Sequence, residues 1–142
     1  ICADHRGFKL KENIKSWLSK NNHEIKDLGA FDYTANDDYV DFAAAVGKTI
    51  SQDSNSRGIV ICGSGVGVDI VANKFPNIRC GLGFSNNQVK AAREDDDINI
   101  LSLASDFTNE EEAKQLISIF LETNFNSTES HTRRIEKIKA LE

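Results

Sequence analysis

Residues 58–75 read GIVICGSGVGVDIVANKF and place one cysteine where a run of Val and Ile meets a glycine-rich turn. The apolar run predicts a buried strand that ends at Cys62. Gly63, Gly65 and Gly67 follow, and the apolar residues after them predict a helix that ends before Pro76. A strand that leads through a tight turn into a helix is the repeating unit of α/β proteins.

The rest of the chain repeats this alternation. Apolar residues at helical spacing predict further helices over 8–18, 39–50, 86–95, 108–123 and 131–141, and short apolar or alternating runs predict strands over 1–3, 23–29, 78–84 and 98–103. Strands that alternate with helices, several of them apolar throughout, indicate a parallel sheet covered on both faces. We therefore expect a single domain over 1–142, an α/β fold of the three-layer α/β/α sandwich type. Its Rossmann-like, mostly parallel sheet would have five strands, with a helix at the C-terminus.

The composition restricts the possible functions. Of the 142 residues, 39% are hydrophobic and 27% charged, and no apolar run is long enough to cross a bilayer, so no membrane partner is expected. The formal net charge is −5 and no basic tract occurs, so no nucleic-acid partner is expected either. An acidic protein can still bind a phosphorylated metabolite through local hydrogen-bond donors.

The cysteines indicate a reducing compartment. Cys2, Cys62 and Cys80 are odd in number and widely spaced, which fits neither a disulfide framework nor a zinc pattern. No signal sequence is visible, so we expect a cytoplasmic protein. The chain opens without Met inside an apolar segment, and we expect its first strand to begin before residue 1.

The glycine turn is the candidate binding site. Ligands of open parallel sheets bind beyond the carboxyl ends of the strands, near a switch in strand order. Glycines let the backbone approach a ligand closely, and their amides, with the start of the next helix, can cradle an anion. The turn matches none of three familiar motifs. A dinucleotide fingerprint needs a third glycine where Val68 stands, a P-loop needs Gly-Lys-Ser/Thr, and a cysteine phosphatase needs arginine at Val68.

Cys62 has two competing interpretations. A free cysteine is often a small buried hydrophobe. The start of a helix instead favours the thiolate form of a nearby cysteine and makes it reactive, and Cys62 lies beside such a start. Cys2 and Cys80 lie within predicted strands and lack this feature, so we interpret them as structural.

Four motifs occur in the order and at the separations of one family: ADHRGFKLK at 3–11, DY at 38–39, ICGSGVGVDIVANKFPNIR at 61–79 and HTRRIEKI at 131–138. On these motifs the chain resembles the type B ribose-5-phosphate isomerases, which are grouped with the galactose-6-phosphate isomerase subunits. The resemblance covers essentially the whole chain. It implies interconversion of ribose 5-phosphate and ribulose 5-phosphate through a cis-enediol, with no metal and no cofactor.

The resemblance also implies roles for residues of the turn. Cys62 stands at the position of the base that moves a proton between C1 and C2, and Ser64 stands near the sugar oxygens. The amides of the turn would stabilise the enediolate as an oxyanion hole does, from Gly63, Gly65, Val66 and Gly67. A base poised near neutral pH with donors at the developing oxyanion is what proton abstraction next to a carbonyl requires.

Other matched positions imply how the sugar and its phosphate are bound. Asp4 and His5 match residues that bind the sugar and help to open its ring, and Tyr39 matches a tyrosine of the same pocket. Arg134 matches a phosphate-binding arginine, with Arg133 beside it. The family forms dimers whose active sites draw on both subunits, sometimes paired into tetramers, so we expect a homodimer or homotetramer.

Several positions depart from the family pattern. Asp95 takes the place of a histidine that acts in ring opening, and Asp96 replaces an asparagine of the binding site. Asp95 can accept a proton but cannot carry positive charge. The competing interpretation of this acidic segment is a solvated turn. For Arg133 and Arg134 the competing interpretation is the exposed face of a terminal helix.

Two family arginines are also missing, since Asp106 and Ser130 stand at their positions. Each lost charge-assisted hydrogen bond ordinarily weakens anion binding by roughly 1.5–3 kcal/mol, so Asp106→Arg is expected to tighten phosphate binding. These departures leave two alternatives open: an isomerase of hexose 6-phosphates of the galactose or allose type, and a non-catalytic phosphosugar-binding relative.

Overall fold

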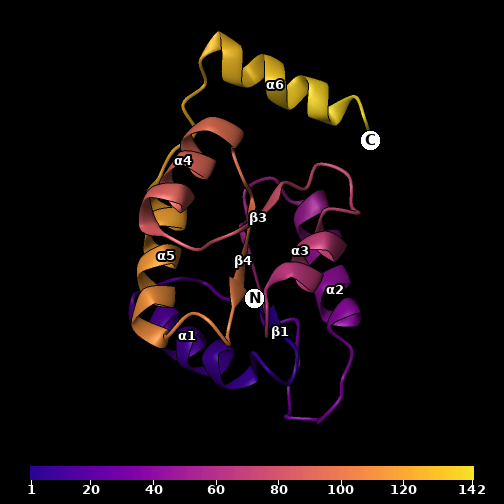
Figure 1. The fold of residues 1–142 in the computed structure, drawn as a ribbon, viewed down its shortest axis with the longest axis vertical. Coiled ribbons are helices and arrows are strands. Elements are labelled where there is room, and N and C mark those ends of the chain that lie inside the picture. The colour runs from indigo at the N-terminus through magenta and orange to yellow at the C-terminus, as the bar shows by residue number, and fades with distance from the viewer.

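The computed structural model describes all 142 residues and contains six helices and one parallel sheet (Figure 1). The sheet has the order β1-β2-β4-β3, with the strands β1 (Cys2–Ala3), β2 (Gly58–Cys62), β4 (Ile100–Ala104) and β3 (Cys80–Leu82). All three pairings are parallel, and β2 and β4 pair along their full length, from Gly58 opposite Ile100 to Cys62 opposite Ala104. The predicted α/β class and parallel sheet are confirmed.

Helices cover both faces of the sheet. Figure 1 shows α1 (Phe8–Lys20), α4 (Asn86–Asp96) and α5 (Glu110–Glu122) on one side, and α2 (Tyr39–Gln52) and α3 (Val66–Ala72) on the other. The last helix, α6 (Glu129–Lys139), lies outside both layers beyond the end of α4 and buries none of its residues. None of the helices is both long enough and apolar enough to span a membrane.

The alternation of side chains along β2 divides the core into two parts. Ile59 and Ile61 pack against the layer of α1, α4 and α5, whereas Val60 and Cys62 pack against α2 and α3. All five residues of β2 are buried, because helices cover both faces, and the strand therefore appears in the sequence as an unbroken apolar run. The Cys62 side chain consequently faces the α2 and α3 side of the sheet.

The sheet has four strands rather than the five expected, because residues 23–29 do not form a regular strand. Part of this segment still runs beside β1. The amide of Leu28 donates to the Ile1 carbonyl at 2.9 Å, and the amide of Ala3 donates to the Gly29 carbonyl at 2.8 Å. Gly29 has φ +101°, outside the range of a regular strand, although the Ala30 amide after it still donates to the Ala3 carbonyl at 2.8 Å, so the pairing is irregular there.

A buried lysine holds this edge segment against α1. The Lys11 side chain has no exposed surface, and its Nζ donates to both Asp27 carboxylate oxygens, at 3.0 and 2.9 Å, and to the Ala30 carbonyl at 2.7 Å. Burial alone would raise the pKa of Asp27, but hydrogen bonds from Lys15 and Lys11 outweigh it and lower this pKa to about 2. The pair fixes the outer edge of the sheet beside the candidate site.

Candidate active site

The candidate site lies where the winding of the sheet reverses direction. From β1 the chain moves outward to residues 28–30 and then returns to form β2 on the other side of β1. Asp4 follows the end of β1, Cys62 ends β2, and the Asp4 amide donates to the Ile61 carbonyl at 3.3 Å. Parallel α/β sheets bind ligands at such a switch point, beyond the carboxyl ends of the strands.

The turn after Cys62 is tied to the end of β4. The Cys62 carbonyl accepts hydrogen bonds from the Ser105 amide at 2.9 Å and from Ser105 Oγ at 3.1 Å. The buried Ser102 hydroxyl donates to the Gly65 carbonyl at 2.6 Å, and Gly65 itself has φ +74°. These bonds hold the turn in place, and Cys62 is only 5% exposed.

Two side chains lie directly against glycines of the turn. A Cβ atom at Gly63 would stand 2.3 Å from the Arg6 guanidinium carbon, and one at Gly67 would stand 2.7 Å from the Tyr39 ring. Any larger residue at either position would displace these side chains. Arg6 and Tyr39 therefore flank the turn that follows Cys62.

The Asp4–Gly7 turn brings a second polar group to this edge. The buried Asp4 carboxylate accepts from the amides of Arg6 and Gly7, both at 3.0 Å, which shapes the entry into α1. His5 Nδ1 lies 2.7 Å from Asp37 Oδ1. Ser64 is exposed, and its Oγ accepts from the Val66 amide at 3.3 Å.

The sequence-predicted residues thus fall into two groups. One edge of the sheet, at the carboxyl ends of the strands, brings together nine of them: Asp4, His5, Tyr39, Cys62, Gly63, Ser64, Gly65, Val66 and Gly67. The other four, Asp95, Asp96, Arg133 and Arg134, lie at the opposite end of the molecule, on the last turn of α4 and on α6 (Figure 1).

The second group lies level with the amino ends of the strands. Arg79, just before β3, donates from Nε to the Asp96 carbonyl at 3.1 Å. The five residues of β2 separate this level from Cys62, a length of about 13 Å at the usual rise of a strand. Within one chain, Asp95 and the tail arginines therefore do not contact the Cys62 turn.

The acidic segment 95–97 divides between two roles. Asp97 has φ +48° and forms ion pairs with Arg79 at 2.8 Å and Arg93 at 2.7 Å, so it is a structural residue. Asp95 lies 3.6 Å from His131 Nε2 on α6. Arg133 and Arg134 are exposed on the same helix.

Two residues of the site were missed by sequence analysis. Arg6 is part of the ADHRGF motif, but nothing in that motif shows that its side chain covers Gly63. Asp37 lies in a polar loop without any pattern. Only the three-dimensional structure brings it to His5.

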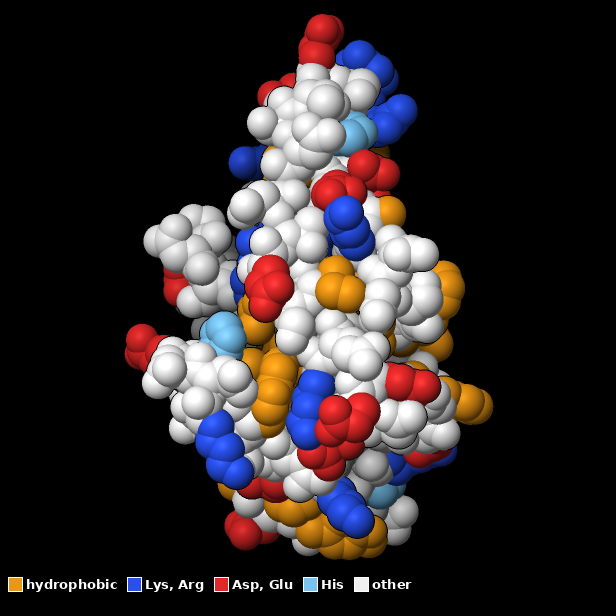
Figure 2. Space-filling view, turned by 90° about the vertical axis from the view of Figure 1, so that its left-hand side faces the viewer, with side chains coloured by type: hydrophobic (Ala, Val, Ile, Leu, Met, Phe, Trp, Pro, Cys, Tyr) orange, Lys and Arg blue, Asp and Glu red, His pale blue; other side chains and the backbone are white.

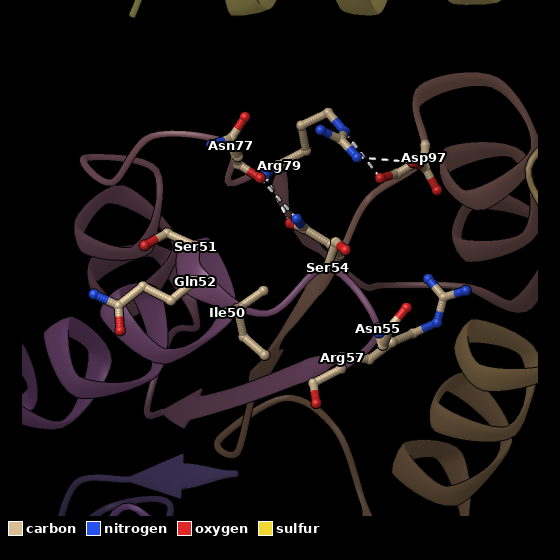
Figure 3. A pocket seen from close by; sticks show the side chains of 11 residues that line it. Ile50, Ser51, Gln52, Ser54, Asn55, Arg57, Asn77, Arg79 and Asp97 are labelled. Carbon is tan, nitrogen blue, oxygen red and sulfur yellow. Dashed lines mark hydrogen bonds and ion pairs between the residues drawn. The ribbon is translucent and has the colours of Figure 1, made fainter.

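Two hollows at the amino ends of the strands do not include the Cys62 turn. One, of about 490 Å³, is lined mostly by polar residues (Figure 3). Its Arg79 is held by Asp97, and its Arg57 lies 5.6 Å from the Phe120 ring of α5. The other, of about 850 Å³, lies beside Ile1 and Leu121. None of the residues predicted from the sequence to form the site lines either hollow.

One face of the molecule shows how charged and hydrophobic side chains are distributed at its surface. On the face formed by α1, α4 and α5, acidic and basic side chains are interspersed, without a basic stripe (Figure 2). Hydrophobic side chains are visible at the lower end of this view and in a strip near its middle. Four aromatic residues that follow strands or the edge segment at the carboxyl side are 62–80% exposed: Phe31, Tyr33, Phe84 and Phe107.

Comparison with known proteins assigns this arrangement to a family. The sequence profile of a family described as Ribose/Galactose Isomerase matches residues 1–138. The chain belongs to the ribose/galactose isomerase family. The family resemblance found in the sequence is thereby confirmed, and the Cys62 turn lies in its most specific motif.

Individual members of the ribose/galactose isomerase family match nearly the whole chain. A probable ribose-5-phosphate isomerase B from Mycoplasma genitalium is 39% identical over 139 residues, which are 97% of this chain and 91% of that protein. The ribose-5-phosphate isomerase B of Mycobacterium tuberculosis strain H37Rv is 36% identical over 136 residues, 96% of this chain and 84% of its own.

Solved structures of this family agree closely in fold. The crystal structure of the Mycoplasma genitalium ribose-5-phosphate isomerase B with bound ribulose-5-phosphate has a TM-score of 0.95 at 38% identity, covering 99% of this chain and 92% of that one. The type B ribose 5-phosphate isomerase of Trypanosoma cruzi has a TM-score of 0.93 at 32% identity, covering 99% and 92%.

Proposed function

We propose that this protein is a cofactor-independent aldose–ketose isomerase that interconverts ribose 5-phosphate and ribulose 5-phosphate. The observation that supports this most is the hydrogen-bonded Cys62 turn at the switch point of the sheet. It occurs in a chain that matches a ribulose-5-phosphate-bound relative over 99% of its length. The relatives cited above bear the same activity in their names.

The chemistry proposed for the turn is a proton transfer between neighbouring carbons. In the ring-opened aldose, the Cys62 thiolate takes the proton from C2, the electron pair forms the C1–C2 double bond, and the C1 carbonyl oxygen becomes the enediolate oxygen. The turn amides stabilise that oxygen. The proton of the C2 hydroxyl passes to the C1 oxygen, the Cys62 thiol returns its proton to C1, and the ketose results.

The remaining residues of the carboxyl edge would prepare the substrate. His5 and Asp4 bind the sugar ring, and His5 takes the proton of the ring hydroxyl as the ring opens. Ser64 and Tyr39 provide hydroxyl groups for the sugar oxygens. Tyr39 is suited to this role because its ring lies against Gly67 at the side of the turn.

The phosphate site requires a second copy of the chain. Asp95, Asp96, Arg133 and Arg134 lie too far from Cys62 to act with it in the same subunit, as the family's shared active sites would predict. Helix α6 projects from the subunit with both arginines exposed. The exposed aromatic residues at the carboxyl edge give an apolar surface of the kind that obligate dimers cover. We therefore propose a homodimer, or a tetramer built from it.

A hexose 6-phosphate isomerase is the second candidate, favoured by the family's description and by Asp95 at the position of a catalytic histidine. One experiment separates the candidates. The purified protein is assayed for isomerisation of ribose 5-phosphate, allose 6-phosphate and galactose 6-phosphate, and each is titrated by calorimetry. The proposed function predicts the highest kcat/KM with ribose 5-phosphate. A clear preference for a hexose phosphate would identify the protein as a hexose 6-phosphate isomerase instead. Binding without turnover would show that it is a non-catalytic relative.

A further inference from the structure

Asp37 is the one residue of the loop 31–38 that is partly buried, whereas its neighbours in the loop are exposed. Its Oδ1 accepts the backbone N–H of His5 at 2.8 Å and lies 2.7 Å from Nδ1 of the His5 ring. One oxygen atom thus binds both the backbone and the side chain of the same residue. Two bonds from a single residue fix the position of the loop and the orientation of the His5 ring together.

The chemistry of the contact determines which ring nitrogen carries hydrogen. An ionised carboxylate can only accept hydrogen bonds, so Nδ1 of His5 must be the donor. In a neutral imidazole the other nitrogen, Nε2, is then bare and accepts hydrogen bonds. A base that takes a proton from a sugar hydroxyl needs such a nitrogen.

We propose that Asp37 is a positioning residue, which holds His5 in the Nδ1–H form so that Nε2 can take the ring-hydroxyl proton of the substrate. The role of His5 in ring opening rests on the proposed function, whereas the tautomer of His5 does not depend on it. Asp37 itself does not touch the substrate. It acts through His5 alone.

The surroundings of Asp37 favour this role over simple anchoring of the loop. Its side chain is 9% exposed, and its second oxygen, Oδ2, is buried without any hydrogen-bond partner. Natural structures rarely leave such an atom unpaired, because burial without a partner is unfavourable. No Lys or Arg forms an ion pair with Asp37, so its charge is directed at the His5 ring. A loop anchor alone would be better served by a neutral, fully bonded side chain.

The tautomer can be measured directly in the free protein. Long-range ¹H–¹⁵N spectra of protein labelled with ¹⁵N-histidine distinguish the two nitrogens, and His5→Gln identifies the His5 signals among those of His23 and His131. At alkaline pH, where an ordinary imidazole is neutral, wild-type His5 should show the Nδ1–H form. Asp37→Ala should shift it to a mixture with Nε2–H, and Asp37→Asn, which keeps an acceptor oxygen, should retain the wild-type form. Asp32→Asn, an exposed charge change in the same loop, is the matched control.

A kinetic cycle tests whether Asp37 acts through His5. Asp37→Ala should lower kcat/KM for ribose 5-phosphate by about 10- to 100-fold, as loss of an orienting partner does, and should have little further effect in the His5→Gln background. Thermal unfolding of each variant shows whether it is folded. Multiplicative losses in the double variant, or an unchanged His5 tautomer in Asp37→Ala, would overturn the proposal. An Nδ1–H wild type that isomerises no sugar phosphate would instead refute the proposed function and leave the positioning intact.

Discussion

Arg6 and Asp106 form an ion pair beside the Cys62 turn. Arg6 Nη2 donates to Asp106 Oδ2, while the rest of the guanidinium lies against Gly63. The Asp106 amide donates to the Gly63 carbonyl at 3.1 Å, so the same residue also binds the turn. Asp106 stands where the family pattern has an arginine, and the structure shows a second effect of this aspartate. It holds the Arg6 guanidinium over the candidate active site.

The first prediction concerns this pair. Arg6→Ala should raise KM for ribose 5-phosphate about 10-fold or more, because the cation that lies over the turn proposed to bind this anionic substrate is lost. Asp106→Arg should also raise KM. The new guanidinium group would repel that of Arg6, and Arg6 would lose the partner that holds it over Gly63. This reverses what the sequence alone suggests. Initial-rate kinetics provide the measurement, and Lys20→Ala, at the far end of α1, is the control. A lower KM in Asp106→Arg would restore the sequence-based interpretation.

The second prediction distinguishes the three thiols. Burial raises the pKa of Cys2 to about 12, and burial together with a hydrogen bond to Asp69 raises the pKa of Cys80 further. Both thiols therefore stay protonated at neutral pH and cannot act as bases there. Cys62→Ser should lower kcat by about 100-fold or more with the fold retained, since an alcohol is a poor base.

Cys2→Ser and Cys80→Ser serve as the matched controls and should keep kcat within a few-fold of wild type. Circular dichroism confirms that each variant is folded. Near-normal turnover in Cys62→Ser would remove Cys62 from the role of base.

The third prediction concerns acid stability. The pKa of Asp27 in the folded protein is about 2, below the ordinary value of an unfolded aspartate. The carboxylate thus stabilises the fold fully above about pH 4, and this contribution of about 2 kcal/mol is lost as the pH falls toward 2. Asp27→Asn leaves the buried ammonium of Lys11 without its carboxylate and should destabilise the protein by about 3 kcal/mol at neutral pH.

Urea unfolding at a series of pH values measures this effect. The difference in unfolding free energy between wild type and Asp27→Asn should shrink between pH 4 and pH 2. A difference that stays constant over this range would show that the stabilisation by Asp27 does not depend on ionisation of its carboxyl group.

Comparison of sequence and structure shows where local patterns suffice. β2 and β4 are buried on both faces, so their apolar runs predicted them directly. The segment 23–29 was predicted as a strand but is irregular, because Gly29 has a positive φ and Lys11 binds Asp27 there. Hydrophobic alternation, on which the prediction rested, reveals neither feature. In the site, the glycine turn was predictable from its own residues. Contacts between distant segments, such as Asp37 with His5, were not.

The fourth prediction tests the departure at Asp95. If Asp95 occupies a working site of the partner subunit, Asp95→His should lower KM for ribose 5-phosphate, because one negative charge leaves a site that binds a dianion. Asp32→Asn is the control, because the nearer Asp97 forms ion pairs with Arg79 and Arg93 and its change would disturb the fold. Loss of an activity that the wild type shows clearly would give Asp95 a role of its own and favour a hexose phosphate as substrate.

The shared active site is tested most directly by complementation between inactive subunits. Cys62→Ser and the double variant Arg133→Ala, Arg134→Ala are co-expressed with different tags, and the heterodimer is purified through both. A two-fold dimer with shared sites then contains one intact site, with Cys62 from one subunit and both arginines from the other, so it should recover about half of the wild-type activity per dimer. A heterodimer as inactive as either parent would contradict a site shared between subunits.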